Sequence, residues 1–135
     1  MRILGGSAYN ATDKTFQHNG LGKMIVQNFY AKDISKLTRS CGTCASRPRF
    51  FEVSNVVVDR LGEFIVGLQS NQGDRSLLLK DILVTNAKRR KDRSLRAAIC
   101  ETFIFIGGSA GSDSDKFGPV PNVCEWSNED NVNIS

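Results

Sequence analysis

Short runs of apolar and β-branched residues recur along the chain, and helical periodicity is nearly absent. Three of these runs align with one another, at residues 23–34, 50–61 and 76–87. Each has an apolar stretch, then one polar residue (Asn28, Asn55 or Asp81), then a second apolar stretch. These polar residues are 27 and 26 positions apart. The pattern predicts a structural repeat built from strands.

The repeat extends in both directions. Upstream, Gly6 fits the position of the repeat that Asn28 occupies in the next run, and downstream residues 97–109 continue the β-rich character. Strand repeats of this length without intervening helices are typical of solenoids. Leucine-rich repeats need a fixed leucine spacing that is missing here, and an immunoglobulin-like sandwich would have shorter strands joined by hairpins. We therefore expect an all-β, single-stranded parallel β-helix whose coils stack about 4.8 Å apart.

Polar residues suggest how the coils bend. Asn28, Asn55 and Asp81 are expected to form an internal ladder, with side chains that hydrogen-bond the backbone at a bend. Asn19 and Gly20 are typical of tight turns and could close a hairpin. At this repeat length they more simply mark a corner between successive coils.

The bulk properties fit one soluble domain. The chain has 135 residues, of which 40% are hydrophobic and 24% charged, enough for a modest core. We expect the β-helix to occupy residues 1–112 and residues 113–135 to form an irregular tail, tied down by Cys124 and Trp126. No apolar run is long enough to span a membrane, and the N-terminal residues lack the apolar segment of a signal peptide.

The positive charge of the chain is local. The net charge of +4 is accounted for by residues 88–93. The favoured interpretation is a solvated loop between strands, and a nuclear-localisation or nucleic-acid patch is the alternative. Neither interleaved aromatic residues nor a recognisable nucleic-acid-binding module supports that alternative. We therefore expect neither a nucleic acid nor a membrane as partner.

The four cysteines indicate disulfide bonds. They allow three pairings among Cys41, Cys44, Cys100 and Cys124. Disulfides are favoured over free thiols and over a metal site, because the chain has only one CxxC motif and no histidine near the other two cysteines. Structural disulfides imply an oxidising, extracellular setting.

Two lysines are placed one repeat apart. The interval from Lys14 to Lys36 equals that from Gly6 to Asn28, so the two lysines should stack on adjacent coils. Ammonium groups that close repel each other unless water, a carboxylate or an anionic ligand lies between them. Arg39 follows shortly after Lys36 and joins the same face only if the chain bends. The constellation suits a polyanionic ligand, although three ordinary surface cations remain the alternative.

The same region resembles a known enzyme family. GGSAYNATDKTFQHNG (5–20), followed by NFYAKDISKLTRSCGTC (28–44), closely resembles the small pectate lyases of polysaccharide lyase family 3. The match is densest over residues 5–44 and weakens toward the C-terminus, where residues 69–74 echo a second family segment. The resemblance implies a right-handed parallel β-helix, secretion, and calcium-dependent β-elimination of polygalacturonate, the acidic polymer of plant cell wall pectin.

The resemblance also implies roles for individual residues. Lys14 and Lys36 match lysines that face substrate carboxylates, and Arg39 matches the arginine proposed as the proton-abstracting base. Gln17 and His18 lie in the same motif and are candidate substrate-binding residues, although His18 is more simply explained as closing a turn. The chemistry is consistent, because removing the proton next to a carboxylate builds negative charge that cations stabilise.

Two departures from the family pattern affect these expectations. The family has glycine where this chain has Ser35, whose Cβ would strain the bend if the position needs a positive φ. The family's main calcium ligands form an acidic cluster on earlier coils, and here Asp13 is the sole upstream carboxylate and a weak metal candidate. Two interpretations follow: an N-terminally truncated piece of a longer lyase, or a truncated, catalytically weak or inactive relative that binds acidic polysaccharide. We expect a monomer unless the exposed end of the solenoid pairs.

Overall fold

The computed structural model describes residues 1–88, 96–104, 118–125 and 132–134. The described part consists of strands and two short 3-10 helices, η1 (Ser70–Gln72) and η2 (Arg96–Ala98). None of its helices is long and apolar enough to cross a membrane. The strands are β1 (Arg2–Ile3), β2 (Gly6–Tyr9), β3 (Lys14–His18), β4 (Gly22–Ser40), β5 (Arg49–Gln69), β6 (Arg75–Thr85), β7 (Cys100–Phe103) and β8 (Val132–Ile134).

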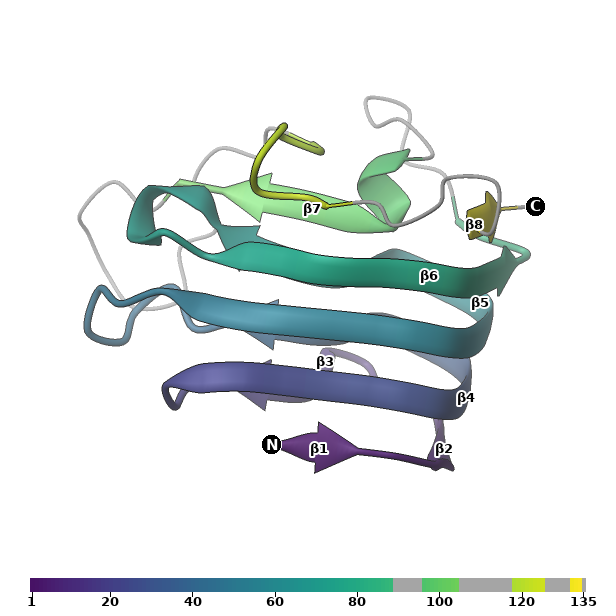
Figure 1. Cartoon of the computed structure of the whole chain (residues 1–135). Coiled ribbons are helices and arrows are strands. Elements are labelled where there is room, and N and C mark those ends of the chain that lie inside the picture. Colours follow the sequence, from purple (N-terminus) through teal and green to yellow (C-terminus); the bar gives the residue numbers. More distant parts are fainter. Residues whose placement is uncertain (89–95, 105–117, 126–131, 135) are drawn as a thin grey trace.

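The strands form a stack of coils. Every strand pairing is parallel, and β1, β2 and β3 pair in turn along the single long strand β4. Strand β4 pairs with β5, which pairs with β6 and β7, and β6 pairs with β8. In Figure 1 the chain runs along the front in β1, returns along the back in β3 and rises to repeat this course, so the coil is right-handed. The predicted parallel β-helix is confirmed.

The first bend of each coil is a ladder of left-handed residues. Asn28, Asn55 and Asp81 have φ of 55°, 52° and 53°, a conformation that asparagine and aspartate tolerate better than other non-glycine residues. The predicted bend is therefore present, but the ladder is not internal. All three side chains are exposed, and Asn55 Nδ2 donates to Asn28 Oδ1 at 2.6 Å. Apolar side chains on either side of the bend fill the interior instead.

A second bend was not expected from the sequence. Asn10, Asp33, Arg60 and Asn86 have φ of 59°, 55°, 63° and 53°, and they stand where each coil turns a second time. Arg60 Nε pairs with Asp33 Oδ1 at 2.8 Å across this bend. Arginine is not a residue that signals a left-handed conformation, so the repeat of this bend is hidden in the sequence.

The register corrects one predicted equivalence. Gly6 pairs with Phe29, not with Asn28. Paired residues of the first two coils are therefore further apart in sequence along β2 than the repeat pattern suggested. The interval shortens along β3, where Lys14 pairs with Lys36 as expected. The change in register falls at the second bend of the first coil, between β2 and β3. The stacking of the two lysines is confirmed, although the Gly6 argument that led to it was wrong.

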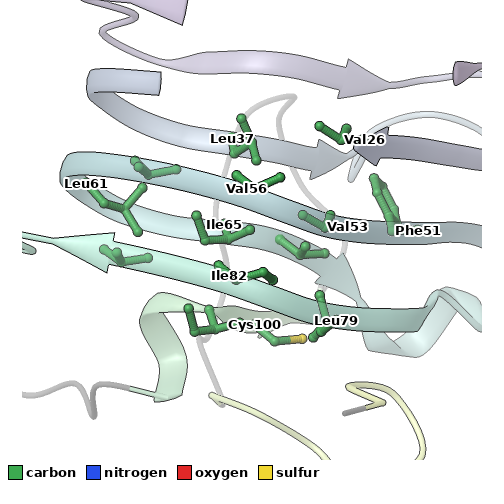
Figure 2. Packing of buried hydrophobic residues seen from close by; sticks show 14 of the residues in the cluster. Val26, Leu37, Phe51, Val53, Val56, Leu61, Ile65, Leu79, Ile82 and Cys100 are labelled. Atoms are coloured by element: carbon green, nitrogen blue, oxygen red, sulfur yellow. The ribbon is translucent and has the colours of Figure 1, made fainter. Parts of the chain in front are cut away.

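The interior of the stack is a column of aliphatic residues. Val26 pairs in register with Val53, and Val53 with Leu79, so equivalent positions of successive coils place their side chains one above another. Figure 2 shows these side chains and those of Leu37 and Ile65 pointing into the same interior. All five residues are completely buried. This burial is the main term that stabilises the fold.

The chain has two disulfides, one within the segment that follows β4 and one that joins β7 to the segment beside β6. Cys41 bonds to Cys44, and Cys100 to Cys124, which confirms the disulfide interpretation and selects one of the three pairings. Cys124 also forms a parallel bridge with Ser76, and β8 extends the sheet beside β6. Residues 89–93 and Trp126 lie outside the described residues, and the division of the chain at residue 112 stays a prediction.

Replacing Asn55 should reveal what the left-handed ladder contributes. We expect Asn55→Ala to lower the free energy of unfolding by about 1–2 kcal/mol, because alanine is strained at a positive φ. Asn55→Gly is the matched control, since it loses the same contact to Asn28 but adopts this φ freely. Urea denaturation of the three proteins measures the difference. An equal loss in both variants would mean that the side-chain contact, not the backbone, dominates.

Candidate functional site

Lys14 and Lys36 lie side by side on adjacent coils. Lys14 begins β3, directly after the second bend, and pairs in register with Lys36 of β4. The side chain of Lys36 is 11% exposed and that of Lys14 30% exposed. Two ammonium groups are thus held on one face by backbone pairing alone, which leaves their mutual repulsion to be compensated by other groups.

Asp13 compensates this repulsion. Its Oδ2 accepts from Lys14 Nζ at 2.7 Å and its Oδ1 accepts from Lys36 Nζ at 3.0 Å. The hydrogen bond from Lys14, followed by that from Lys36, lowers the pKa of the Asp13 carboxyl below its ordinary value. One carboxylate therefore bridges both ammonium groups, which is the arrangement that the close spacing of the lysines requires. The Asp13 side chain is 62% exposed, so solvent and ligands can reach it.

Glu63 adds a second carboxylate that the sequence did not reveal. It lies on β5, one coil beyond Lys36, with its Oε1 3.6 Å from Lys36 Nζ. The same oxygen accepts a hydrogen bond from Ser35 Oγ at 3.3 Å. Ser35 is not among the residues with a positive φ, so the strain considered for its Cβ does not arise. The serine instead helps to hold Glu63 against Lys36.

Arg39 is near this face but covered. It is only 5% exposed, and its guanidinium carbon lies 4.0 Å from the centre of the Phe103 ring. Its Nη1 donates to the carbonyl oxygen of Ser40 at 2.8 Å. When the Gln69 amide oxygen is oriented toward Arg39, it accepts from Nη2 and Nη1 at 2.8 and 3.2 Å. Arg39 thus follows Lys36 on the same strand, but it is buried and not part of the exposed surface around the lysines.

Two aromatic rings separate Lys36 from Arg39. Lys36 Nζ is 5.9 Å from the centre of the Phe64 ring, which meets Phe103 edge-on with centres 5.6 Å apart. Gly67 makes this packing possible, because a Cβ there would clash with the Phe64 ring and lie 2.8 Å from Arg39. Cations over aromatic faces are stabilised by the ring quadrupole. Lys36 and Arg39 are therefore positioned by one aromatic layer.

His18 and Gln17 occupy different environments. His18 is buried, its Nε2 lies 2.9 Å from the carbonyl oxygen of Gly22, and its ring meets Phe51 edge-on. This hydrogen bond closes the Asn19–Gly20 turn, which connects β3 to β4 and is the corner between coils that the sequence predicts. Gln17 is exposed and pairs in register with Arg39, so it lies beside the covered arginine.

A buried arginine and aspartate hold the corner next to the site. Arg49 is 2% exposed, and its guanidinium donates to the carbonyl oxygens of Asn19 and Gly20, each at 2.9 Å. Asp74 accepts from the backbone N–H groups of Arg49 and Gln69, each at 2.9 Å, and burial raises the pKa of its carboxyl. These contacts fix Gln69 against Arg39. Sequence reasoning missed Arg49 because a lone arginine gives no signal of burial.

The described residues do not fit a calcium site. Nowhere in the described part of the chain do three or more His, Cys, Asp or Glu side chains gather as metal ligands. Asp13, the candidate ligand, has both oxygens bonded to ammonium groups. A dication would be repelled by Lys14 and Lys36, and calcium needs several oxygen ligands. Asp13, the carboxylate that would have to bind calcium, is instead bonded to two lysines.

Comparison with known proteins gives a consistent result. The family model described as pectate lyase matches residues 1–104. A probable pectate lyase F of Aspergillus terreus is 46% identical over 76 residues, which cover 56% of this chain and 32% of that protein. Pectate lyase E of Emericella nidulans is 37% identical over 106 residues, covering 69% and 41%. A probable pectate lyase D of Aspergillus fumigatus is 32% identical over 127 residues, covering 93% and 48%.

The chain therefore spans about a third to a half of the length of these relatives. The matched family region, residues 1–104, includes Lys14, Lys36, Arg39 and both cysteines of the CxxC motif. No solved structure gave a significant match.

The shared carboxylate can be tested by titration. We expect the Asp13 carboxyl to titrate below its ordinary pKa, and Lys14→Ala to raise that pKa more than Lys36→Ala does. NMR observation of the carboxyl carbon measures these pKa values. Because the folded pKa is lowered, the ion pairs contribute to stability above the ordinary carboxyl pKa, and the contribution is lost as the pH falls through the lowered one. The control is Lys80→Ala, because Lys80 is exposed and precedes the first bend, away from Asp13. A changed Asp13 pKa in this variant would contradict the explanation that its contacts with Lys14 and Lys36 lower the pKa.

Proposed function

Because this chain belongs to the pectate lyase family, we propose that it acts in the eliminative cleavage of pectate and that Lys14 and Lys36 bind a galacturonate carboxylate. The relatives named pectate lyases are two to three times longer than the matched part, so the activity of the whole protein is part of this proposal. Polygalacturonate, a linear polymer with one carboxylate per sugar, is the proposed substrate.

The observation that supports this function most directly is the bridge formed by Asp13. One carboxylate accepts from both ammonium groups, at 2.7 and 3.0 Å. A uronate carboxylate has the same two oxygens and the same charge, so it can replace Asp13 between the lysines or share them with it. Charge-assisted hydrogen bonds of this kind are short and comparatively strong. The Asp13 bridge therefore supports the proposal that a substrate carboxylate binds between the same two ammonium groups.

The proposed chemistry follows from the charge that develops during the reaction. Removing the C5 proton of a galacturonate places negative charge on its carboxylate, and elimination then breaks the bond to the leaving sugar oxygen at C4. Two fixed ammonium groups stabilise this charge more in the transition state than in the bound substrate. The β3–β4 pairing aligns the two lysines before the substrate binds, so they need no rearrangement during the reaction.

Arg39 is the candidate proton acceptor. It can reach a bound sugar only if its guanidinium leaves the Phe103 ring and the Gln69 amide, since it is 5% exposed where it lies. Guanidinium groups release a proton only under strongly alkaline conditions, so the proposal requires activity to rise with pH. Exposed Gln17 beside Arg39 is a candidate hydrogen-bond partner for the polymer, and His18 acts by holding the corner.

Two further parts of the proposal concern calcium and location. The family implies calcium, but Asp13 and its neighbours do not fit this ion, because both Asp13 oxygens are bonded to ammonium groups. Two disulfides support secretion, since such bonds persist in oxidising compartments.

A second candidate function is non-catalytic binding of acidic polysaccharide through the same lysines. The buried position of Arg39 favours it, because a covered side chain cannot take a proton from a ligand. In that case Lys36→Ala would weaken polymer binding, while no variant and no pH would give a cleavage product.

Absorbance of the unsaturated uronide product distinguishes the two functions. With polygalacturonate at alkaline pH, we expect Lys36→Ala to reduce kcat/KM by about a hundredfold, the usual effect of losing a preorganised electrostatic group. Arg39→Lys should retain more activity than Arg39→Ala and shift the pH profile. Lys80→Ala should behave as the parent protein. Binding of the polymer without product at any pH would reject the lyase and leave the binding function.

A further inference from the structure

The second bend of the first coil contains an acceptor sequence for a covalently attached glycan. Asn10, Ala11 and Thr12 form the pattern Asn-X-Ser/Thr, in which X is not proline. Enzymes of the secretory pathway attach an oligosaccharide to the asparagine of this pattern where it lies on the surface of a secreted protein. The pattern is short, so the position of these residues in the fold decides whether they can serve as an acceptor.

The backbone at this corner is held against the next coil, and the acceptor side chains face solvent. The Asn10 N–H donates to the carbonyl oxygen of Lys32 at 3.1 Å, and the carbonyl oxygen of Ala11 accepts from the Ser35 N–H at 2.9 Å. Asn10 has a φ of 59° and forms the bend itself. Asn10 and Thr12 are both exposed. The two residues that a transferase must reach are therefore presented on an outer corner.

The Asn10 amide differs from the amides at the other bends. Asn55 Nδ2 donates to Asn28 Oδ1 at 2.6 Å, and Asn86 Nδ2 donates to Asp59 Oδ1 at 2.8 Å. The Asn10 side chain forms no hydrogen bond with another residue of the described part of the chain. None of the other described asparagines with a positive φ has serine or threonine two positions later. Asn10 thus combines the acceptor pattern with an amide that the fold does not use.

Two exposed aromatic rings lie next to the same corner. Tyr9 directly precedes Asn10 and is 59% exposed, and Tyr30 of β4 is 37% exposed. Their ring centres are 6.0 Å apart. A tyrosine combines an apolar ring with a polar hydroxyl group, which suits contact with a sugar that has an apolar face and a polar rim. A glycan on Asn10 would therefore have a protein surface beside it that it can cover.

We propose that Asn10 is an N-glycosylation site that receives an oligosaccharide from a lipid-linked diphosphate donor. In this transfer the Asn10 amide nitrogen gives one proton to a base of the transferase and forms a bond to the anomeric carbon of the first sugar. The bond between that carbon and the diphosphate oxygen breaks, and the lipid diphosphate leaves with the electron pair. The inference goes beyond the lyase activity, but it rests on the secretion included in the proposed function.

Mass spectrometry of protein made in a secretory host tests this assignment. The chain is fused to a secretion signal and produced in an Aspergillus species, the genus of several relatives. The peptide that contains Asn10 is analysed before and after release of the glycan by peptide N-glycosidase in heavy-oxygen water. We expect a glycan on this peptide and, on release, conversion of Asn10 to aspartate with one heavy oxygen. Asn10→Gln and Thr12→Ala should abolish the modification, whereas Thr12→Ser should keep it.

A second occurrence of the pattern supplies the matched control. Asn133, Ile134 and Ser135 have the same residue types, but Asn133 lies in β8 and pairs in register with Leu83 instead of forming a bend. Asn133→Gln should leave the glycan on Asn10 in place. A glycan on Asn133 with none on Asn10 would overturn the inference, as would a glycan on Asn10 that persists in Thr12→Ala.

The outcomes are independent of the lyase assay. The fused signal delivers the chain to the transferase whatever its natural location, and the peptide is sought in the cells as well as in the medium, because the transfer precedes export. An unmodified Asn10 in both samples overturns the inference and leaves the proposed function standing. Loss of uronide product without loss of the glycan would reject the lyase and leave the modification site. Because Asn10 and Thr12 are exposed, circular dichroism of their variants should match the parent protein.

Discussion

Parallel backbone pairing between successive coils is the constraint on which the other features depend. It places Lys14 beside Lys36, although their ammonium groups repel each other and neither side chain would favour that position alone. The pairing is held by the buried aliphatic column, which stabilises each coil only against its neighbours. Asp13 then lowers the electrostatic cost of an arrangement that the backbone imposes. The site formed by Lys14, Lys36 and Asp13 therefore results from the register in which β3 pairs with β4.

The features that could be predicted from the sequence are those that repeat or stand close together. The polar residues of the first bend recur at a nearly constant interval, and asparagine and aspartate are suited to left-handed backbone, so the β-helix could be inferred. The spacing of Lys14 and Lys36 matched the repeat and predicted their stacking. The oxidised state of the cysteines followed from the lack of other ligands, although their pairing required the structure.

The features that were missed depend on contacts between distant residues. The second bend includes Arg60, whose side chain gives no hint of a positive φ. Arg39 is covered by Phe103, which belongs to another coil and is far away in sequence. Arg49 is buried only because a corner formed by residues 19–20 surrounds its guanidinium with carbonyl oxygens. Local patterns do not record such neighbours.

The division of the lysine pair between two coils has a consequence for the mechanics of the fold. An anion held by Lys14 and Lys36 at once is a cross-link between β3 and β4 as well as a bound ligand. By thermodynamic linkage, a ligand that binds the paired coils and not the separated ones stabilises their pairing, by an amount that grows with its affinity and its concentration. Ligand binding and the resistance of the two coils to local opening are thus thermodynamically coupled. Any substitution that loosens β3 from β4 weakens binding without touching the lysines.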